Sequence, residues 1–344
     1  MNHPSLKGRR VTIVGNRGGT NIGGSFERAG QQVGLNLQIM EPREAMNAPK
    51  FVRYFNWHLR GRRPTWLTTF SSKVAESSMQ HESEALLVTG IAPVTAGALE
   101  LLRKASVKVA NYLTDDPFNE MHKAPWFLKS LPNYFSVFSP RRANLDDLRR
   151  AGCAHVEYLP FGYDPELHFP EAPAAEDGKV GGVVLFVGGA DADRIPICKS
   201  IADADLPLAI YGDYWDRYAV TRPYYRGYAD LATLRKATTS AAVCLCLTRK
   251  ANRDGHTMRS YEIPAMRGLI LAEETDDHRE MFGDEGDCAL FFRGTSEMVD
   301  KAKWLLGHQE EGRQMADRAY TRITGGKNTY GDRLETILDT CLNR

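Results

Sequence analysis

The sequence lacks any apolar run close to the ~18 residues that a membrane-spanning helix needs, so a transmembrane protein is not expected. Residues 1–10 contain no apolar stretch of the kind found in secretory signals. Cysteine is sparse, with six in 344 residues, no C-x-x-C pair and no histidine pair at zinc-ligand spacing. Cys244 and Cys246 fall in the apolar run 242–247, which is typical of buried, reduced thiols. We therefore expect a cytoplasmic protein without a bound metal.

Net charge is also nearly absent, at +1, although a quarter of the residues are charged. A nucleic-acid partner is not expected, because binding phosphates requires an excess of Lys and Arg. Residues 1–170 carry 21 basic against 15 acidic residues, and residues 171–344 carry 23 against 28. The net charges of the two halves have opposite signs, which fits two domains, and the length of the chain fits two domains as well. The alternative is that the difference in charge is composition noise.

Short apolar runs alternate with helical segments along the chain, which predicts parallel α/β sheets. In the first half, strands are expected at 10–14, 35–40, 85–90, 107–113, 133–139 and 155–159, and helices at 25–34 (capped by Ser25), 95–105 and 143–151. In the second half, strands are expected at 183–187, 208–212, 241–247 and 269–272, and helices at 193–202, 229–238, 257–266 and 332–342.

The repetition predicts two Rossmann-like domains, with ligands at the carboxyl edges of the sheets, in a cleft. The segment 169–182 is rich in Pro, Ala, Gly and acid and has no period, as in a linker. The expected domains cover residues 1–168 and 183–325. Residues 326–344, which include the last predicted helix, form a segment separate from both expected domains.

The glycine-rich segment 15–25 follows the first predicted strand. It lacks the G-x-G-x-x-G spacing, and in the Walker A pattern that nearly fits from Gly18 to Ser25, Gly24 replaces the essential lysine. An NTPase is therefore rejected. Two interpretations remain, a ligand- or anion-binding loop with Gly18, Gly19 and Thr20 at its centre, or a plain tight turn.

Two further segments in the first half carry chemistry. Asp115 and Asp116 follow a predicted strand end, where one of them is a candidate base for a sugar hydroxyl, or a helix cap. The aromatic and basic stretch 55–66 is interpreted first as a solvated amphipathic helix. The alternative is contact with an anionic acceptor or a membrane surface, that is, peripheral membrane binding.

The segment 249–268 is dense in Arg, His and acid. It leaves the strand 241–247, loops through Asp254 and Gly255, and enters a helix expected near Thr257. Free N–H groups at a helix start favour an anion such as a diphosphate. Asp254 and Glu262 stand eight residues apart, and such carboxylates can accept hydrogen bonds from sugar or ribose hydroxyls.

Residues 252–265, Asn-Arg-Asp-Gly-His-Thr-Met-Arg-Ser-Tyr-Glu-Ile-Pro-Ala, resemble a motif of the CgeB-like glycosyltransferases, the spore-maturation-protein family. The order and spacing of further motifs are similar to that family across nearly the whole chain. These motifs are 112–117, 158–165, 185–189 with Arg194, 210–215 and 271–282.

The resemblance implies a GT-B fold, two Rossmann-like domains with parallel sheets, and sugar transfer from a nucleotide-sugar donor without a metal or other cofactor. The acceptor is not identified, and it could be a small molecule, a glycan or a protein. Asp254 and Glu262 resemble the E-x7-E element of retaining GT-B enzymes, with Asp in place of the first Glu. By that match Asp254 and the backbone of 255–258 face the donor sugar and diphosphate, and Glu262 holds the ribose.

The resemblance also implies that Arg194 neutralises the leaving diphosphate and that Tyr228 lies near the base. By the same resemblance, the domain over 1–168 is on the acceptor side, the domain over 183–325 binds the donor, and the segment 326–344 crosses back onto the first domain. The candidate catalytic residues are Asp115, Asp116, His256 and Arg194. The implied donor-binding residues are Asp254, Gly255, Thr257, Met258, Arg259, Glu262, Tyr228 and Gly188. The alternatives are a GT-B epimerase or hydrolase that uses the same donor site, and a non-catalytic nucleotide-sugar-binding protein.

Overall fold

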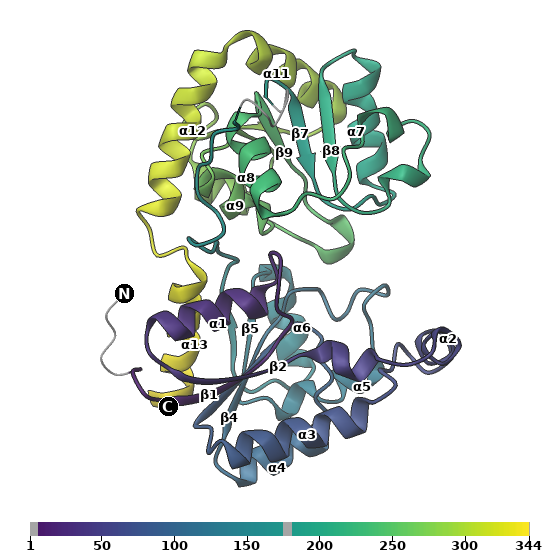
Figure 1. Ribbon diagram of the computed structural model, residues 1–344, viewed down its shortest axis with the longest axis vertical. Coiled ribbons are helices and arrows are strands. Elements are labelled where there is room, and N and C mark those ends of the chain that lie inside the picture. Colours follow the sequence, from purple (N-terminus) through teal and green to yellow (C-terminus); the bar gives the residue numbers. More distant parts are fainter. Residues whose placement is uncertain (1–5, 175–180, 344) are drawn as a thin grey trace. The chain divides into compact units, whose positions relative to one another are not determined.

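The computed structural model describes residues 6–174 and 181–343, which form two compact units (Figure 1). The first unit comprises Met1–Pro160, Ala251–Arg253 and Tyr330–Arg344, and the second comprises Phe161–Lys250 and Asp254–Thr329. The expected linker 169–182 includes residues 175–180, which lie outside the described residues. The chain instead passes from the first unit to the second between Pro160 and Phe161.

The first unit contains a six-stranded parallel sheet, as the alternation of strands and helices predicts. Its strands lie in the order β2-β1-β3-β4-β5-β6. Their bounds are β1 (Arg10–Val14), β2 (Asn36–Met40), β3 (Ala85–Thr89), β4 (Lys108–Tyr112), β5 (Ser136–Ser139) and β6 (Val156–Tyr158).

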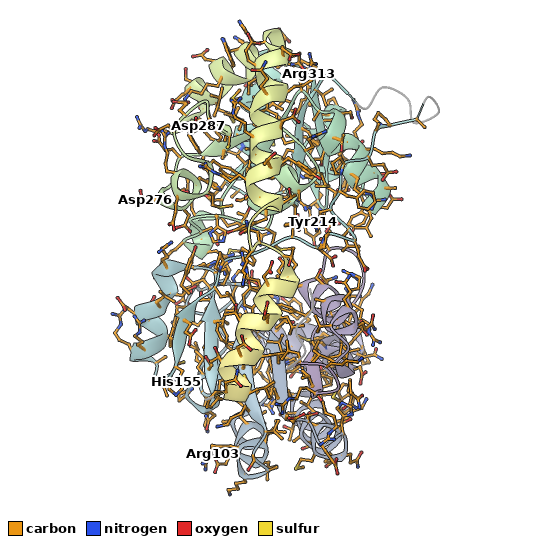
Figure 2. All side chains as sticks on the ribbon, turned by 90° about the vertical axis from the view of Figure 1, so that its left-hand side faces the viewer. Arg103, His155, Tyr214, Asp276, Asp287 and Arg313 are labelled. Carbon is orange, nitrogen blue, oxygen red and sulfur yellow. The ribbon has the colours of Figure 1, made fainter. Side chains whose placement is uncertain are left out.

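Helices cover both faces of this sheet. The helices of the first unit are α1 (Ile22–Gln32), α2 (Lys50–Leu59), α3 (Leu67–Gln80), α4 (Ala96–Lys104), α5 (Pro125–Leu128), α6 (Leu145–Arg150) and α13 (Tyr330–Asn343). On one face Phe26 of α1 makes edge contacts with Tyr112 of β4 and Tyr330 of α13. Figure 2 shows α13, in yellow, lying over the strands of this sheet. The C-terminal helix is therefore part of the core of the first unit.

Helix α1 begins three residues earlier than expected, and Ser25 is not its cap. The helix starts at Ile22, so Ser25 lies buried in the first turn. The physical reason is close packing: a Cβ on Gly23 would lie 2.8 Å from the Gly15 Cα, so only glycine lets the helix start against the end of β1. The glycines that suggested a flexible loop partly belong to the helix.

The second unit contains a five-stranded parallel sheet in the order β11-β10-β9-β7-β8. Its strands are β7 (Val184–Val187), β8 (Leu208–Tyr211), β9 (Val243–Cys246), β10 (Ile270–Glu273) and β11 (Ala289–Phe292). Its helices are α7 (Arg194–Asp203), α8 (Leu231–Ser240), α9 (Arg259–Ala265), α10 (Asp276–Phe282), α11 (Thr295–Gly307) and α12 (Gln309–Thr324). Sequence reasoning missed β11 and helices α10 to α12.

Both sheets share one strand order. Counted from the first strand of each unit, the five strands β1 to β5 and the five strands β7 to β11 both lie in the order 2-1-3-4-5. In this order the chain reverses its winding between the first and third strands, and ligands of open α/β sheets bind outside the carboxyl ends at that point. In the second unit the reversal lies between β7 and β9.

The described part of the chain contains no helix long and apolar enough to cross a membrane.

Candidate functional site

The candidate site of the second unit lies where β7 and β9 end. β7 runs into Gly188 and Gly189, and the Trp215 Nε1 donates a hydrogen bond of 2.7 Å to the Gly188 carbonyl. Gly212, after β8, has a φ of +130°, and a Cβ there would lie 2.3 Å from the Gly188 carbonyl oxygen. The backbone at Gly212 therefore packs directly against the backbone at Gly188, and this contact fixes the loop after β7.

Arg194 begins α7 and folds back over this loop. Its Nη1 donates to the Gly189 carbonyl at 3.3 Å, and its guanidinium lies 5.5 Å from the centre of the Phe186 ring. The side chain is buried, and its Nε has no hydrogen-bond partner among the described residues, although Asp191 Oδ2 lies 3.5 Å away. A buried cation with an unused donor is suited to bind an anion.

A second cation stands close to Arg194. Burial lowers the pKa of Arg194, and repulsion from Arg249 lowers it further, against the smaller opposing effects of Asp191 and Asp254. Arg249 follows β9 and is exposed, so the two arginines flank the point between β7 and β9 where the sheet reverses its winding. Sequence reasoning assigned no role to Arg249, although its position just after a buried strand could have suggested one.

The loop after β9 leads into α9, which begins at Arg259, two residues later than expected, and has only seven residues. The Thr257 N–H already donates to Ser260 Oγ at 3.0 Å. Asp254 Oδ2 accepts a hydrogen bond of 3.2 Å from the Arg249 N–H, which folds the loop back toward the arginine pair. The arginines are therefore better candidates for binding an anion than the start of this short helix.

Glu262 lies in the first turn of α9 with no exposed surface. Its Oε2 pairs with the partly exposed Arg259 guanidinium, and its buried Oε1 has no hydrogen-bond partner within the described ranges. The His168 Nε2 lies 3.6 Å from that Oε1. Because His168 Nδ1 accepts a hydrogen bond from the Asp164 N–H, the ring proton of neutral His168 is on Nε2, on the side of Glu262.

His256 is predicted to be catalytic, but its surroundings are those of a residue that holds the loop. It is buried, its Nε2 accepts a hydrogen bond of 3.2 Å from the Phe161 N–H, and its Nδ1 lies 2.8 Å from Asp277 Oδ2. The lone pair that a general base would use is therefore already engaged. We interpret His256 as a positioning residue, because it ties the loop after β9 to α10.

A second buried histidine, His278, holds the start of α9. Its Nδ1 donates to the Glu273 carbonyl at 2.7 Å, so its Nε2 accepts from the Ser260 hydroxyl at 2.8 Å. Burial lowers the pKa of His278 to about 4. The ring is therefore neutral, as this hydrogen-bond pattern requires.

We expect this burial to make the protein acid-sensitive. Between about pH 6.5 and about pH 4 the unfolded chain protonates His278 but the folded chain does not, so stability falls as the pH drops through this window. A shift of ~2.5 pKa units corresponds to about 3 kcal/mol. In urea unfolding at both ends of the window, His278→Gln should lose less stability on acidification than the wild type. The control His308→Gln, at an exposed histidine, should lose as much stability on acidification as the wild type. Equal acid sensitivity of all three proteins would contradict the assignment of the lowered pKa to His278.

The other donor-binding residues predicted from the sequence lie along the same edge of the sheet. Thr257 and Met258 precede α9, and the Arg259 Nε donates to the Val187 carbonyl at 3.2 Å, which brings α9 against the end of β7. Tyr228 is largely exposed and follows Gly227, whose carbonyl accepts from the Gly212 N–H at 3.0 Å. The structure thus brings Tyr228 to the loop after β8, where a contact with the base stays a prediction.

In the first unit, Asp116 is engaged in structural contacts. Its Oδ1 accepts from the Phe118 N–H at 2.9 Å, and its Oδ2 accepts from the Arg253 Nε at 2.7 Å. The hydrogen bond with Asp116 raises the pKa of Arg253, and so does a contact of 2.7 Å with Asp147. Asp115 is partly exposed and accepts only from the Thr114 hydroxyl among its described contacts, so it is the more available carboxylate.

Arg253 reaches these carboxylates from the end of the short 3-10 turn η7 (Lys250–Asn252), and its own φ is +54°. A pocket of about 520 Å³ adjoins the three charges. Asp116, Asp147 and Arg253 line it together with Phe118, Asn119, Arg150, Ala151 and Ala251. Sequence reasoning missed this ion-pair cluster, because its members are far apart in the chain.

The loop with Gly18, Gly19 and Thr20 is a tight turn. Gly18 and Gly19 have φ angles of +79° and +51°, and the Asn21 side chain donates to the Gly18 carbonyl at 2.8 Å. That this loop contacts a ligand stays a prediction. Across residues 6–174 and 181–343, no three His, Cys, Asp or Glu side chains are grouped so that they could hold a metal ion.

Known proteins resemble this chain in part of its sequence and in its fold. Residues 194–339 match the protein family described as glycosyl transferase-like. No curated protein matches the sequence of the chain. Among solved structures, the chain is similar to sucrose-phosphate synthase from Thermosynechococcus elongatus, with a TM-score of 0.68 and 13% identity over 97% of this chain and 99% of that one.

Two further structures are similar over their whole length. The α,α-trehalose 6-phosphate synthase from Burkholderia multivorans has a TM-score of 0.64 and 12% identity, over 98% of both chains. Anabaena HepE, solved in complex with UDP-glucose, has a TM-score of 0.57 and 11% identity, over 96% of this chain and 99% of that one. The chain therefore has the GT-B fold, and its residues 194–339 are similar to glycosyl transferase-like proteins.

Proposed function

We propose that the protein is a glycosyltransferase that moves a sugar from a nucleotide-diphosphate-sugar donor to an acceptor hydroxyl. The observation that carries the proposal is the pair of arginines, Arg194 and Arg249, at the carboxyl edge of the second sheet. The two cations repel each other at the sheet edge where ligands bind in this fold. A doubly charged anion such as a diphosphate would offset that repulsion. The family match over 194–339 and the UDP-glucose complex of HepE support this choice of donor.

The proposed reaction does not require a metal, because the protein supplies the positive charge. As the bond between the sugar and the diphosphate breaks, negative charge grows on the leaving phosphate oxygens. Fixed cations stabilise that charge more in the transition state than in the bound donor, which lowers the barrier. In this proposal Arg194, fixed by Gly189 and Phe186, is the principal group. Asp115, in the first unit, stays the candidate base that the sequence predicts.

Glu262 is proposed to hold the ribose of the donor, as the resemblance to CgeB-like glycosyltransferases implies. Its free Oε1 is a strong acceptor for a hydroxyl, but Arg259 and His168 cover the carboxylate. Arg259 is the only one of these three side chains with substantial exposure. We therefore propose that the ribose displaces Arg259, whose guanidinium then becomes available to the diphosphate.

We expect Glu262→Gln to weaken nucleotide-sugar binding by roughly 10- to 100-fold. The amide keeps the size of the side chain, but a neutral acceptor forms a weaker hydrogen bond than a carboxylate. The measurement is thermal shift and titration against UDP-, GDP- and dTDP-sugars, with Glu311→Ala on the exposed surface of α12 as the control. Unchanged affinity in the Glu262→Gln variant would exclude this residue from the ribose site.

Incubation of the wild type with each nucleotide sugar, with and without candidate acceptors, tests the reaction itself. Consumption of the donor only when an acceptor is present supports transfer. Conversion of the sugar without an acceptor would identify an epimerase or hydrolase on the same donor site instead. If no nucleotide sugar raises the melting temperature, the proposal that this protein binds a nucleotide-sugar donor is wrong.

A further inference from the structure

Helix α2 presents apolar side chains to solvent. At 100° per residue, Phe51, Phe55 and Leu59 follow one another along a single stripe of the helix. Their exposed fractions are 78%, 44% and 72%, where a soluble helix normally buries such a stripe. We call these three residues the α2 stripe. The helix is solvated, as expected, but its apolar side is exposed to water together with its polar side.

Contacts at both ends hold α2 in place, while its stripe stays uncovered. Asn56 is the one buried residue of the helix. Before the helix, the Asn47 carbonyl accepts from Trp66 Nε1 at 2.8 Å, and after it the Arg62 carbonyl accepts from Trp126 Nε1 at 3.2 Å. Figure 1 shows α2 at the outer edge of the first unit, away from the sheet. The stripe is therefore available to a partner without any change in the core.

The charge around the stripe has one sign. No Asp or Glu occurs between Glu44 and Glu76. Four cations in that interval, Lys50, Arg53, Arg60 and Arg63, make no ion pair within the part of the chain that the structure describes. By the helical spacing, Arg53 and Arg60 lie on the opposite side of α2 from Phe55. Their long side chains can reach past the helix toward an anionic surface.

We propose that α2 binds the surface of an anionic lipid bilayer, with its axis in the plane of the interface. The α2 stripe enters the boundary between headgroups and acyl chains, and the cations on the opposite side of the helix reach back along it to lipid phosphates. Aromatic side chains are favoured at this boundary, and Tyr54, which directly precedes Phe55 in α2, is also exposed. The inference goes beyond the proposed transfer reaction and does not depend on it.

A second copy of the chain fits this surface less well. Packing α2 against its own copy would bring the cations of both helices together with no acidic residue of the segment to balance them. An anionic bilayer meets both features at once, because it offers an apolar interior and a negative surface. Charge complementarity therefore favours the membrane.

Sedimentation of the full chain with lipid vesicles tests the proposal, without nucleotide sugar. We expect binding to phosphatidylcholine vesicles that contain phosphatidylglycerol, and much weaker binding to phosphatidylcholine alone. Each cation near such a surface contributes a factor of ~5 in affinity, so Arg53→Gln/Arg60→Gln should bind roughly 25-fold more weakly. Phe51→Ser/Leu59→Ser should lose at least about tenfold, because two apolar side chains no longer leave water.

The matched control is Leu101→Ser/Arg149→Gln, which removes one exposed apolar and one exposed basic side chain from α4 and α6. It should bind anionic vesicles like the wild type, and all variants should keep the melting temperature, since the substituted side chains are exposed. Absence of wild-type binding, or equal binding by every variant, overturns the proposal. A change of oligomeric state in Phe51→Ser/Leu59→Ser with unchanged vesicle affinity would identify a protein interface instead.

Discussion

Replacing Arg194 with methionine is expected to lower the rate of sugar transfer by a factor of roughly 100 to 1,000, which is typical when a fixed group that stabilises developing charge is removed. Methionine fills similar space above Phe186 but cannot balance the charge of the leaving diphosphate. The loss should appear in kcat more than in donor affinity, because the negative charge on the leaving diphosphate is larger in the transition state than in the bound donor. Steady-state kinetics with the donor that gives the largest thermal shift measure it.

The stability of the same variant separates catalysis from folding. In the free protein Arg194 is buried and repelled by Arg249, so removing its charge should leave the melting temperature unchanged or raise it. Arg313→Met, at an exposed pair with Glu310 on α12, controls for the loss of any arginine and should affect neither property. Figure 2 labels Arg313 at the surface of the second unit. An Arg194→Met variant with normal turnover would remove this residue from the mechanism.

The substitution Gly255→Ala is expected to destabilise the protein by about 3 kcal/mol and to abolish donor binding. The new Cβ would lie 2.4 Å from Asp277 Oδ2, so the carboxylate must move away from the buried His256 that it binds at 2.8 Å. Breaking a buried hydrogen bond to a charged group costs about 1.5–3 kcal/mol, and the displaced loop adds to this. The Thr275 hydroxyl, which donates to the Gly255 carbonyl at 2.5 Å, resists any compensating shift of the loop.

Calorimetry and nucleotide-sugar titration of this variant test the role of the loop. Gly307→Ala provides the matched control, because a Cβ there meets no atom within 4 Å and α11 gains a better helix former. We expect the Gly255→Ala protein to melt several degrees lower than Gly307→Ala. If the two proteins melt alike, the contact between Gly255 and Asp277 does not constrain the site.

Much of the fold could be predicted from local sequence patterns. The apolar runs that became β7, β8 and β9 are buried on both faces, and runs of this kind indicate a parallel strand wherever they occur. Short elements were less predictable. β11 has only four residues, Ala289–Phe292, and an apolar run of that length does not distinguish a strand from a buried piece of helix.

The candidate site was predicted in part. Glu262, Asp254 and Arg194 follow predicted strands of the second unit, and the structure places them along the same edge of the sheet. The engagement of His256 could not be predicted, because its partners Phe161 and Asp277 are 95 and 21 residues away. The same holds for Asp116, whose partner Arg253 lies 137 residues along the chain.

By itself the sequence determined the α/β class, the division into two halves and the segments that bear chemistry. These follow from hydrophobic period, strand length and residue type, which are local properties. The tertiary structure alone decided which side chains are available. In the folded chain His256 and Asp116 are held by structural hydrogen bonds, Arg194 is buried near Arg249, and the α2 stripe is exposed to solvent. Availability depends on what packs against a side chain from elsewhere in the chain, and no local pattern contains that information.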